Sequence, residues 1–206
     1  MLSILQAAGW PIIPLVLCSV VAMALIVERF LTLRAAKVAP SRLVDEVISV
    51  TRASLPTADT IQKLADNSVL GQVLAQGLQT AADGRISEER LRAGLEAAGR
   101  QAVHELERNL NALGTIASAA PLFGLLGTVI GMIEIFAASG GTTSGSGDPQ
   151  ALAHGISVAL YNTAFGLMVA IPSLMAHRHF RTKVDGFALQ MEQSAEVNRL
   201  IRDFIA

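Results

Sequence analysis

The chain is poor in charge and almost without cysteine. Of its 206 residues 16% are charged and one is a cysteine, Cys18, so neither a disulfide framework nor a thiolate metal site can be built. Aromatic residues make up 4%, and a net charge of −1 provides no clustered basic face, which excludes a nucleic-acid binder. Apolar residues make up 51%, which argues against a disordered chain.

Charge is missing altogether from three long stretches, residues 1–27, 109–133 and 149–177. A helix needs about 20 apolar residues to cross the hydrocarbon core of a bilayer, and all three stretches meet that length. The sequence therefore predicts an all-α integral membrane protein with three transmembrane helices. A removable signal peptide is disfavoured, because no positive charge precedes the first apolar run.

Basic residues are confined to two segments. Eleven of the sixteen lie within residues 28–108 and five follow residue 177, so the positive-inside rule places both segments in the cytoplasm. The predicted order is an external N-terminus with the first transmembrane helix (1–33), a cytoplasmic helical region (34–108), the second transmembrane helix (109–136), a periplasmic loop (137–150), the third transmembrane helix (151–177) and a cytoplasmic helical tail (178–206).

Apolar periodicity extends the second and third transmembrane helices into the cytoplasm as long helices. Apolar residues step by three or four from Leu91 to Leu110, which predicts a helix that runs without interruption into the second span. After the third span the apolar stripe comprises Phe180, Val184, Phe187, Met191, Ala195, Val197, Ile201 and Phe204. The sequence predicts a helix start at Pro40–Ser41, a helix break and restart at Pro56–Thr57 and a turn at Asp83–Gly84. Residues 139–147 predict a flexible external loop.

No stretch predicts an enzyme. The glycine-rich residues 140–147 have no lysine after them and no strand before them, which argues against a phosphate-binding loop. His177 and His179 have the spacing of a metal pair, but without a third ligand an interfacial role is the better interpretation. We expect no catalytic residue, no cofactor and no metal.

The distinctive residues lie inside the predicted spans. Glycines let neighbouring helices approach closely, and prolines remove a backbone hydrogen bond. The predicted helix-packing residues are Gly124, Gly127, Gly131, Gly166, Pro121 and Pro172. The third span also carries Ser157, Tyr161, Asn162 and Thr163, and polar groups at this depth face a bundle interior or a water-filled path. These residues alone leave interhelical hydrogen bonding and pore lining both open.

Several motifs carry a family resemblance. They are Glu28-Arg29-Phe30, Gly124-Leu125-Leu126-Gly127-Thr128, Gly155-Ile156-Ser157, Ala159-Leu160, Thr163-Ala164, Gly166-Leu167 and Val169-Ala170-Ile171-Pro172. With these motifs and three spans, the sequence resembles the ExbB/TolQ/MotA proton-channel family over nearly its whole length. It is most similar to the ExbB and TolQ branch, because MotA has four spans.

The resemblance implies a subunit of a membrane motor in the bacterial inner membrane. Family members form a homopentamer around an ExbD- or TolR-like single-span partner with a membrane-embedded aspartate, and proton flow does work on a TonB- or TolA-like energy transducer. Thr128 and Thr163 match the family's pore-lining pair. The candidate proton path comprises Thr128, Thr163, Asn162, Tyr161 and Ser157, with Glu134 as a possible proton entrance.

One position departs from the family pattern. Many members carry a glutamate five residues before the third-span threonine, where this chain has Val158. Proton transfer would then depend on a partner carboxylate, and Glu134 is either a proton collector or a solvated interfacial group. The function implied is an ExbB-like stator that powers transport across the outer membrane. The alternatives are a TolQ-like subunit of a Tol-Pal system for envelope maintenance and a non-conducting scaffold for the ExbD-like partner. A permease is disfavoured.

Overall fold

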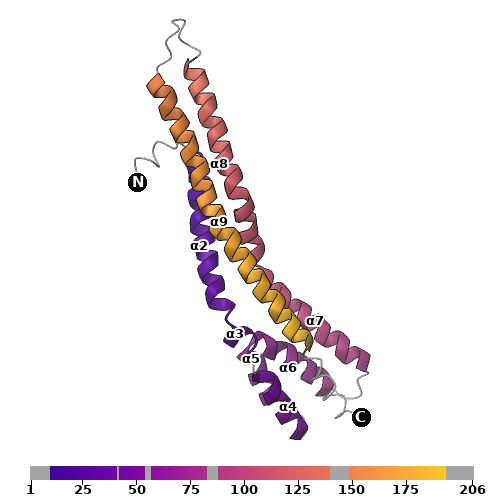
Figure 1. Cartoon of the computed structure of the whole chain (residues 1–206). Coiled ribbons are helices and arrows are strands. Elements are labelled where there is room, and N and C mark those ends of the chain that lie inside the picture. The colour runs from indigo at the N-terminus through magenta and orange to yellow at the C-terminus, as the bar shows by residue number, and fades with distance from the viewer. Residues whose placement is uncertain (1–9, 41, 54–56, 83–87, 140–148, 194–206) are drawn as a thin grey trace. The chain divides into compact units, whose positions relative to one another are not determined.

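The computed structural model describes residues 10–40, 42–53, 57–82, 88–139 and 149–193. All the regular secondary structure within these residues is helical, as the sequence predicts. The helices are α2 (Ile12–Thr32), α3 (Ala35–Val38), α4 (Leu43–Ala53), α5 (Ala58–Asn67), α6 (Val69–Ala82), α7 (Glu88–Glu107), α8 (Leu110–Ser139) and α9 (Pro149–Gln193) (Figure 1). The predicted turn at Asp83–Gly84, most of the predicted loop 139–147 and the tail beyond Gln193 lie outside the described residues.

Within the part of the chain that the structure describes, three helical stretches are long and apolar enough to cross a membrane. They are Ile12–Thr32 in α2, Arg92–Ala137 across α7 and α8, and Gly155–Glu192 in α9. The prolines Pro121 and Pro172 lie inside α8 and α9 without ending either helix. Membrane helices tolerate such prolines because neighbouring helices and side chains compensate the freed carbonyl groups.

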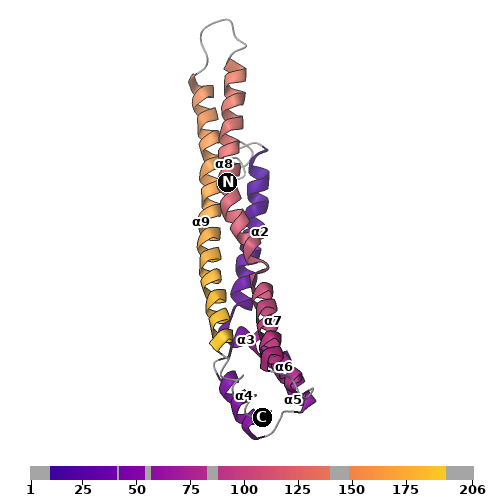
Figure 2. The ribbon, with the colours of Figure 1, turned by 90° about the vertical axis from the view of Figure 1, so that its right-hand side faces the viewer.

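The chain divides into two compact units, of which the first contains residues 1–27 and 110–178. Within it, α8 and the first part of α9 lie side by side with α2 (Figures 1 and 2). Their shared core is formed by Leu15, Ala120, Val169 and Ala170, with Cys18, Ile116, Phe123 and Phe165 packed against it. The small side chains of Ala120 and Ala170 let α8 and α9 approach each other at this core.

The outward surface of the first unit is apolar. Large apolar side chains on all three helices are more than half exposed, including Ile13, Leu17, Val20, Leu122, Leu125, Ile133, Leu160, Met168 and Ile171. Exposed apolar patches of this extent mark a membrane or protein interaction surface. This surface therefore suits contact with lipid or with further transmembrane helices.

The second unit contains residues 28–109 and 179–206. Helix α6 packs on both α5 and α7, and the buried side chains of α6 include Leu70, Val73, Leu74 and Leu78. The described part of the predicted α9 stripe is buried as well, with Phe180, Val184, Phe187 and Met191 at most 9% exposed. The helical periodicity of this stripe is therefore confirmed.

The junction of α7 and α8 corrects one expectation. The sequence predicts an uninterrupted helix through Arg108, but a turn at Arg108–Asn109 separates α7 from α8. In a continuous helix the Leu106 carbonyl would accept a hydrogen bond from the Leu110 N–H. Here the buried Arg29 side chain donates to that carbonyl at 3.0 Å, so a tertiary hydrogen bond competes with the helical one.

Candidate functional site

Helices α8 and α9 of the first unit meet through backbone atoms. A Cβ atom on Gly166 would lie 2.7 Å from the Ala120 carbonyl oxygen and 3.1 Å from the Gly124 Cα. A Cβ atom on Gly124 would lie 2.9 Å from the Asn162 carbonyl oxygen and 3.0 Å from the Thr163 Cα. Because any side chain at these two positions would meet backbone atoms, only glycine permits this separation of the helices.

The predicted packing glycines Gly127 and Gly131 differ in how closely they approach α9. A Cβ atom on Gly127 would lie 2.8 Å from the Asn162 Cβ, whereas one on Gly131 would lie 3.4 Å from the Ala159 Cβ, an ordinary contact. The small-xxx-small pair Gly127 and Gly131 therefore faces the chain's own α9. This contact lies within the chain itself.

The two candidate threonines donate to neighbouring carbonyl groups of one α8 turn. The Thr163 Oγ1 of α9 donates to the Gly124 carbonyl at 3.3 Å, and the Thr128 Oγ1 donates to the Leu125 carbonyl at 2.7 Å. A hydroxyl that donates once still has lone pairs to accept with. Both hydroxyl groups can therefore accept a hydrogen bond from a further group without giving up their present bond.

Asn162 lies on the side of α9 that faces α8 and is 1% exposed. Its side chain faces Gly127 and has a polar interaction of its own, yet no described residue donates a hydrogen bond to its buried Oδ1 atom. The structure thus brings Asn162, Thr163, Gly124 and Gly127 together at the α8–α9 contact, with Thr128 on the same turn of α8.

The remaining candidate path residues lie elsewhere. Tyr161 is 48% exposed, and Ser157, one helical turn before it, is exposed and donates to the Ala153 carbonyl at 2.9 Å. Glu134 is exposed near the end of α8, and Val158 is half-buried. Within a single subunit, Tyr161 and Ser157 therefore face outward, away from the buried side of α9 that holds Asn162.

A polar junction in the second unit carries residues that the sequence presents only as a motif. Arg29 is 4% exposed; its Nη1 donates to the Leu106 carbonyl, and its Nε donates to Glu28 Oε2 at 3.1 Å. The same Oε2 accepts from Asn109 Nδ2 at 3.0 Å. The end of α2 is thereby bonded to the last turn of α7 and to the turn that follows it. The charged pair Glu28–Arg29 directly after a long apolar run was the available signal.

The two histidines contact different residues. In the first unit, a Cβ atom on Gly114 would lie 3.0 Å from His177 Nε2, so this ring packs on a glycine of α8. In the second unit, the His179 ring stacks on Phe30 with centroids 6.4 Å apart. Among the described residues, no group of three or more His, Cys, Asp or Glu side chains could hold a metal ion.

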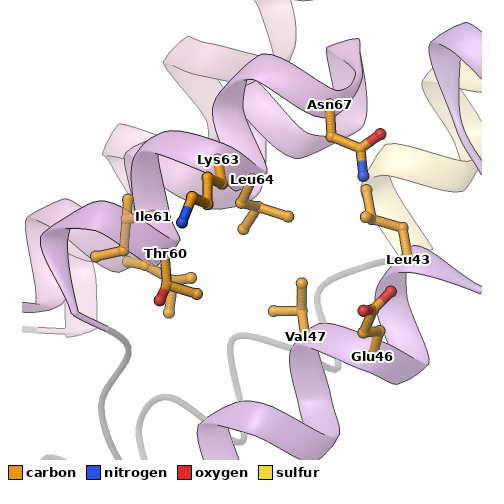
Figure 3. A pocket seen from close by; sticks show the side chains of 9 residues that line it. Leu43, Glu46, Val47, Thr60, Ile61, Lys63, Leu64 and Asn67 are labelled. Atoms are coloured by element: carbon orange, nitrogen blue, oxygen red, sulfur yellow. The ribbon is translucent and has the colours of Figure 1, made fainter.

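A cavity of about 190 Å³ lies in the second unit between α4, α5 and α6. Figure 3 shows Val47 and Glu46 of α4 on one side and Ile61 and Leu64 of α5 on the other. The Lys63 amine on its rim is paired with Asp59 at 2.6 Å. The lining is largely apolar and gathers no set of polar groups suited to catalysis.

The comparisons with known proteins identify the family of the chain. Residues 65–193 match the model of the MotA/TolQ/ExbB proton channel family. The chain belongs to this family. It is 32% identical over 202 residues to the "Putative biopolymer transport protein ExbB-like 3" of Synechocystis, covering 97% of this chain and 94% of that protein.

Two further relatives match shorter parts of the chain. Biopolymer transport protein exbB1 of Vibrio cholerae is 46% identical over 71 residues, which cover 34% of this chain and 31% of that protein. Tol-Pal system protein TolQ of Haemophilus influenzae is 39% identical over 83 residues, covering 40% of this chain and 36% of that protein. The ExbB/TolQ/MotA assignment made from the motifs is therefore confirmed, and with three apolar spans the chain is a multi-pass membrane protein.

Proposed function

We propose that the chain is the proton-channel stator subunit of an inner-membrane energy-transducing complex of the ExbB–ExbD–TonB type. In this role it couples the proton motive force to transport across the outer membrane. Family membership supports a stator-like role in general. The observation that carries the proposal is the pair of threonine hydroxyl groups held on adjacent carbonyls of one α8 turn.

The hydroxyl geometry suggests how a partner carboxyl group is handled. A protonated carboxyl group can donate to either threonine oxygen while both threonines keep their bonds to the backbone. A carboxylate only accepts, so one hydroxyl must turn away from its carbonyl to meet it. The Thr163 bond, at 3.3 Å, is long for a hydroxyl donor, whereas the Thr128 bond is 2.7 Å. Thr163 is therefore the hydroxyl that turns, and Thr128 the one that stays.

The assembly belongs to the same proposal. The subunits form a homopentamer around an ExbD- or TolR-like partner, with the N-terminus and residues 137–150 in the periplasm and residues 34–108 and 178–206 in the cytoplasm. The distribution of basic residues supports this orientation. The outward-facing Tyr161 and Ser157 support contacts with further helices, because polar groups at this depth avoid lipid. Native mass spectrometry in mild detergent would show a monomer if this were wrong.

A TolQ-like role is the second candidate, and the similarity to the Haemophilus TolQ protein favours it. Affinity purification of the complex from its own cells separates the two roles. Recovery of an ExbD-like and a TonB-like protein supports the first role, and recovery of a TolR-like and a TolA-like protein supports the second.

The test of proton transfer is the substitution Thr163→Val, which replaces the hydroxyl with a methyl group of similar volume. Proton flux into proteoliposomes containing the chain and its ExbD-like partner is expected to fall more than about tenfold with the complex intact. If the hydroxyl is only structural, its loss costs about 0.6–1 kcal/mol and flux survives.

The matched control is Thr115→Val in α8, the helix on which the Thr163 hydroxyl is bonded. The Thr115 hydroxyl donates only to its own turn, to the Asn111 carbonyl at 2.9 Å, so flux should be retained. Full flux in Thr163→Val with a normal complex would remove Thr163 from the path. Absence of flux from the unmodified complex would instead favour the non-conducting scaffold that Val158 suggests.

A further inference from the structure

The end of the first membrane span presents exposed apolar side chains. Phe30 and Leu31, in the last turn of α2, are 56% and 51% exposed. The Phe30 ring stacks on His179 at 6.4 Å and meets the edge of the buried Phe180 ring at 5.2 Å. This surface is therefore formed by α2 and α9 together, within the second unit.

Basic residues follow the contacting residues Phe30 and His179 closely in the sequence. We define the basic cluster as Arg34, Lys37, His179 and Lys183. Arg34 follows Phe30 by four residues, and the Leu33 N–H still bonds to the Arg29 carbonyl, so the chain keeps its helical path up to that point. Lys37 lies in the short helix that Arg34 caps, and Lys183 follows His179 by one turn on the same face of α9.

The charges of the basic cluster are not neutralised locally. Among the described residues no carboxylate forms an ion pair with Arg34, Lys37 or Lys183. The adjoining acid, Glu28, is bonded to Arg29 and Asn109. Asp185 lies two residues beyond Lys183, about 200° around the helix, and so on the other side of α9.

We infer that this surface binds the headgroup of an anionic phospholipid, with its acyl chains against the apolar side chains of α2. A soluble anion would engage the basic cluster but leave Phe30 and Leu31 in water. A phospholipid covers both, because its phosphate and its acyl chains meet at the depth where a membrane span ends. The inference rests on α2 crossing the membrane and is independent of proton conduction.

Native mass spectrometry of the delipidated complex tests this directly. The complex is titrated in neutral detergent with phosphatidylglycerol or with phosphatidylcholine, and phosphatidylglycerol is expected to bind preferentially. Each lysine or arginine near an anionic surface contributes about fivefold in affinity. The triple variant Arg34→Gln/Lys37→Gln/Lys183→Gln should therefore lose at least about tenfold in phosphatidylglycerol affinity, with phosphatidylcholine binding unchanged.

The matched control removes three arginines from α7, in the variant Arg90→Gln/Arg92→Gln/Arg100→Gln, and should retain phosphatidylglycerol. Unchanged binding in the first variant, or an equal loss in the control, overturns the inference. Displacement of the lipid by millimolar inorganic phosphate overturns it too, since a lipid site also uses the acyl chains. If the triple variant does not assemble, the single variants Arg34→Gln and Lys37→Gln are measured, and binding within twofold of the unmodified chain in both overturns it.

Discussion

Replacing Gly166 by alanine tests the α8–α9 contact where a new Cβ atom would lie nearest to backbone atoms. The new Cβ atom would lie 2.7 Å from the Ala120 carbonyl oxygen, and ordinary contact begins at 3.4 Å. Since the obstructing atoms belong to the backbone, the helices themselves must move apart by about 0.7 Å. The Thr163–Gly124 hydrogen bond, at 3.3 Å, would then stretch to about 4.0 Å, beyond hydrogen-bonding distance.

The expected free-energy change combines three contributions. Overpacking costs about 1–3 kcal/mol and the lost hydrogen bond about 0.6 kcal/mol, while alanine in a helix recovers up to about 1 kcal/mol. We expect a net destabilisation of about 0.6–3.6 kcal/mol, together with reduced proton flux, because the Thr163 hydroxyl loses its position.

Unfolding of the purified protein in detergent, titrated with sodium dodecyl sulfate, measures the stability change. Gly131→Ala is the control on the same contact, since its Cβ atom would meet the Ala159 Cβ at 3.4 Å, and it should be close to neutral. Gly99→Ala, which meets nothing within 4 Å, should stabilise by up to about 1 kcal/mol. A Gly166→Ala variant as stable as Gly131→Ala would refute the close backbone contact.

Two other predictions address the junction and the topology. Arg29→Met should destabilise the chain by about 1–3 kcal/mol, because it leaves the Leu106 carbonyl and Glu28 without their buried donor. The control Arg92→Met breaks an exposed pair with Glu96 and should cost less than about 1 kcal/mol. Equal unfolding midpoints for the two variants would contradict this prediction. The orientation is tested by single cysteines introduced in a Cys18→Ala background. A cysteine at position 144, in place of Ser144, should react with an impermeant thiol reagent added from the periplasmic side, and one in place of the exposed Gln76 should not. The reverse labelling pattern would refute the orientation.

The spans were predictable because they depend on composition alone. Three charge-free stretches must leave water, and each overlaps one of the long apolar helical stretches that begin at Ile12, Arg92 and Gly155. The buried stripe of α9 was predictable for a similar reason, since Phe180 and Val184 repeat with the helical period.

Features that depend on a distant partner were not predictable from the sequence. Asn162 and Tyr161 are adjacent polar residues, but α8 packs on one side of α9, so the first is buried and the second is half exposed. Which side faces α8 depends on glycines about 40 residues earlier in the chain, such as Gly124. At the break before α8, the Leu106 carbonyl accepts a hydrogen bond from Arg29, 77 residues earlier, which local periodicity cannot reveal.

The bond from Arg29 to the Leu106 carbonyl also sets an order of events during synthesis. The two residues are 77 positions apart, and a ribosome adding about 5–20 residues per second needs about 4–15 s to produce that length. Throughout that interval the first span is complete while its arginine lacks its final acceptor. Glu28, its immediate neighbour, is present from the start and can partly neutralise the charge of Arg29 until α7 has been made. The junction can close only when α7 has been made, so the first span forms well before its end is bonded to α7.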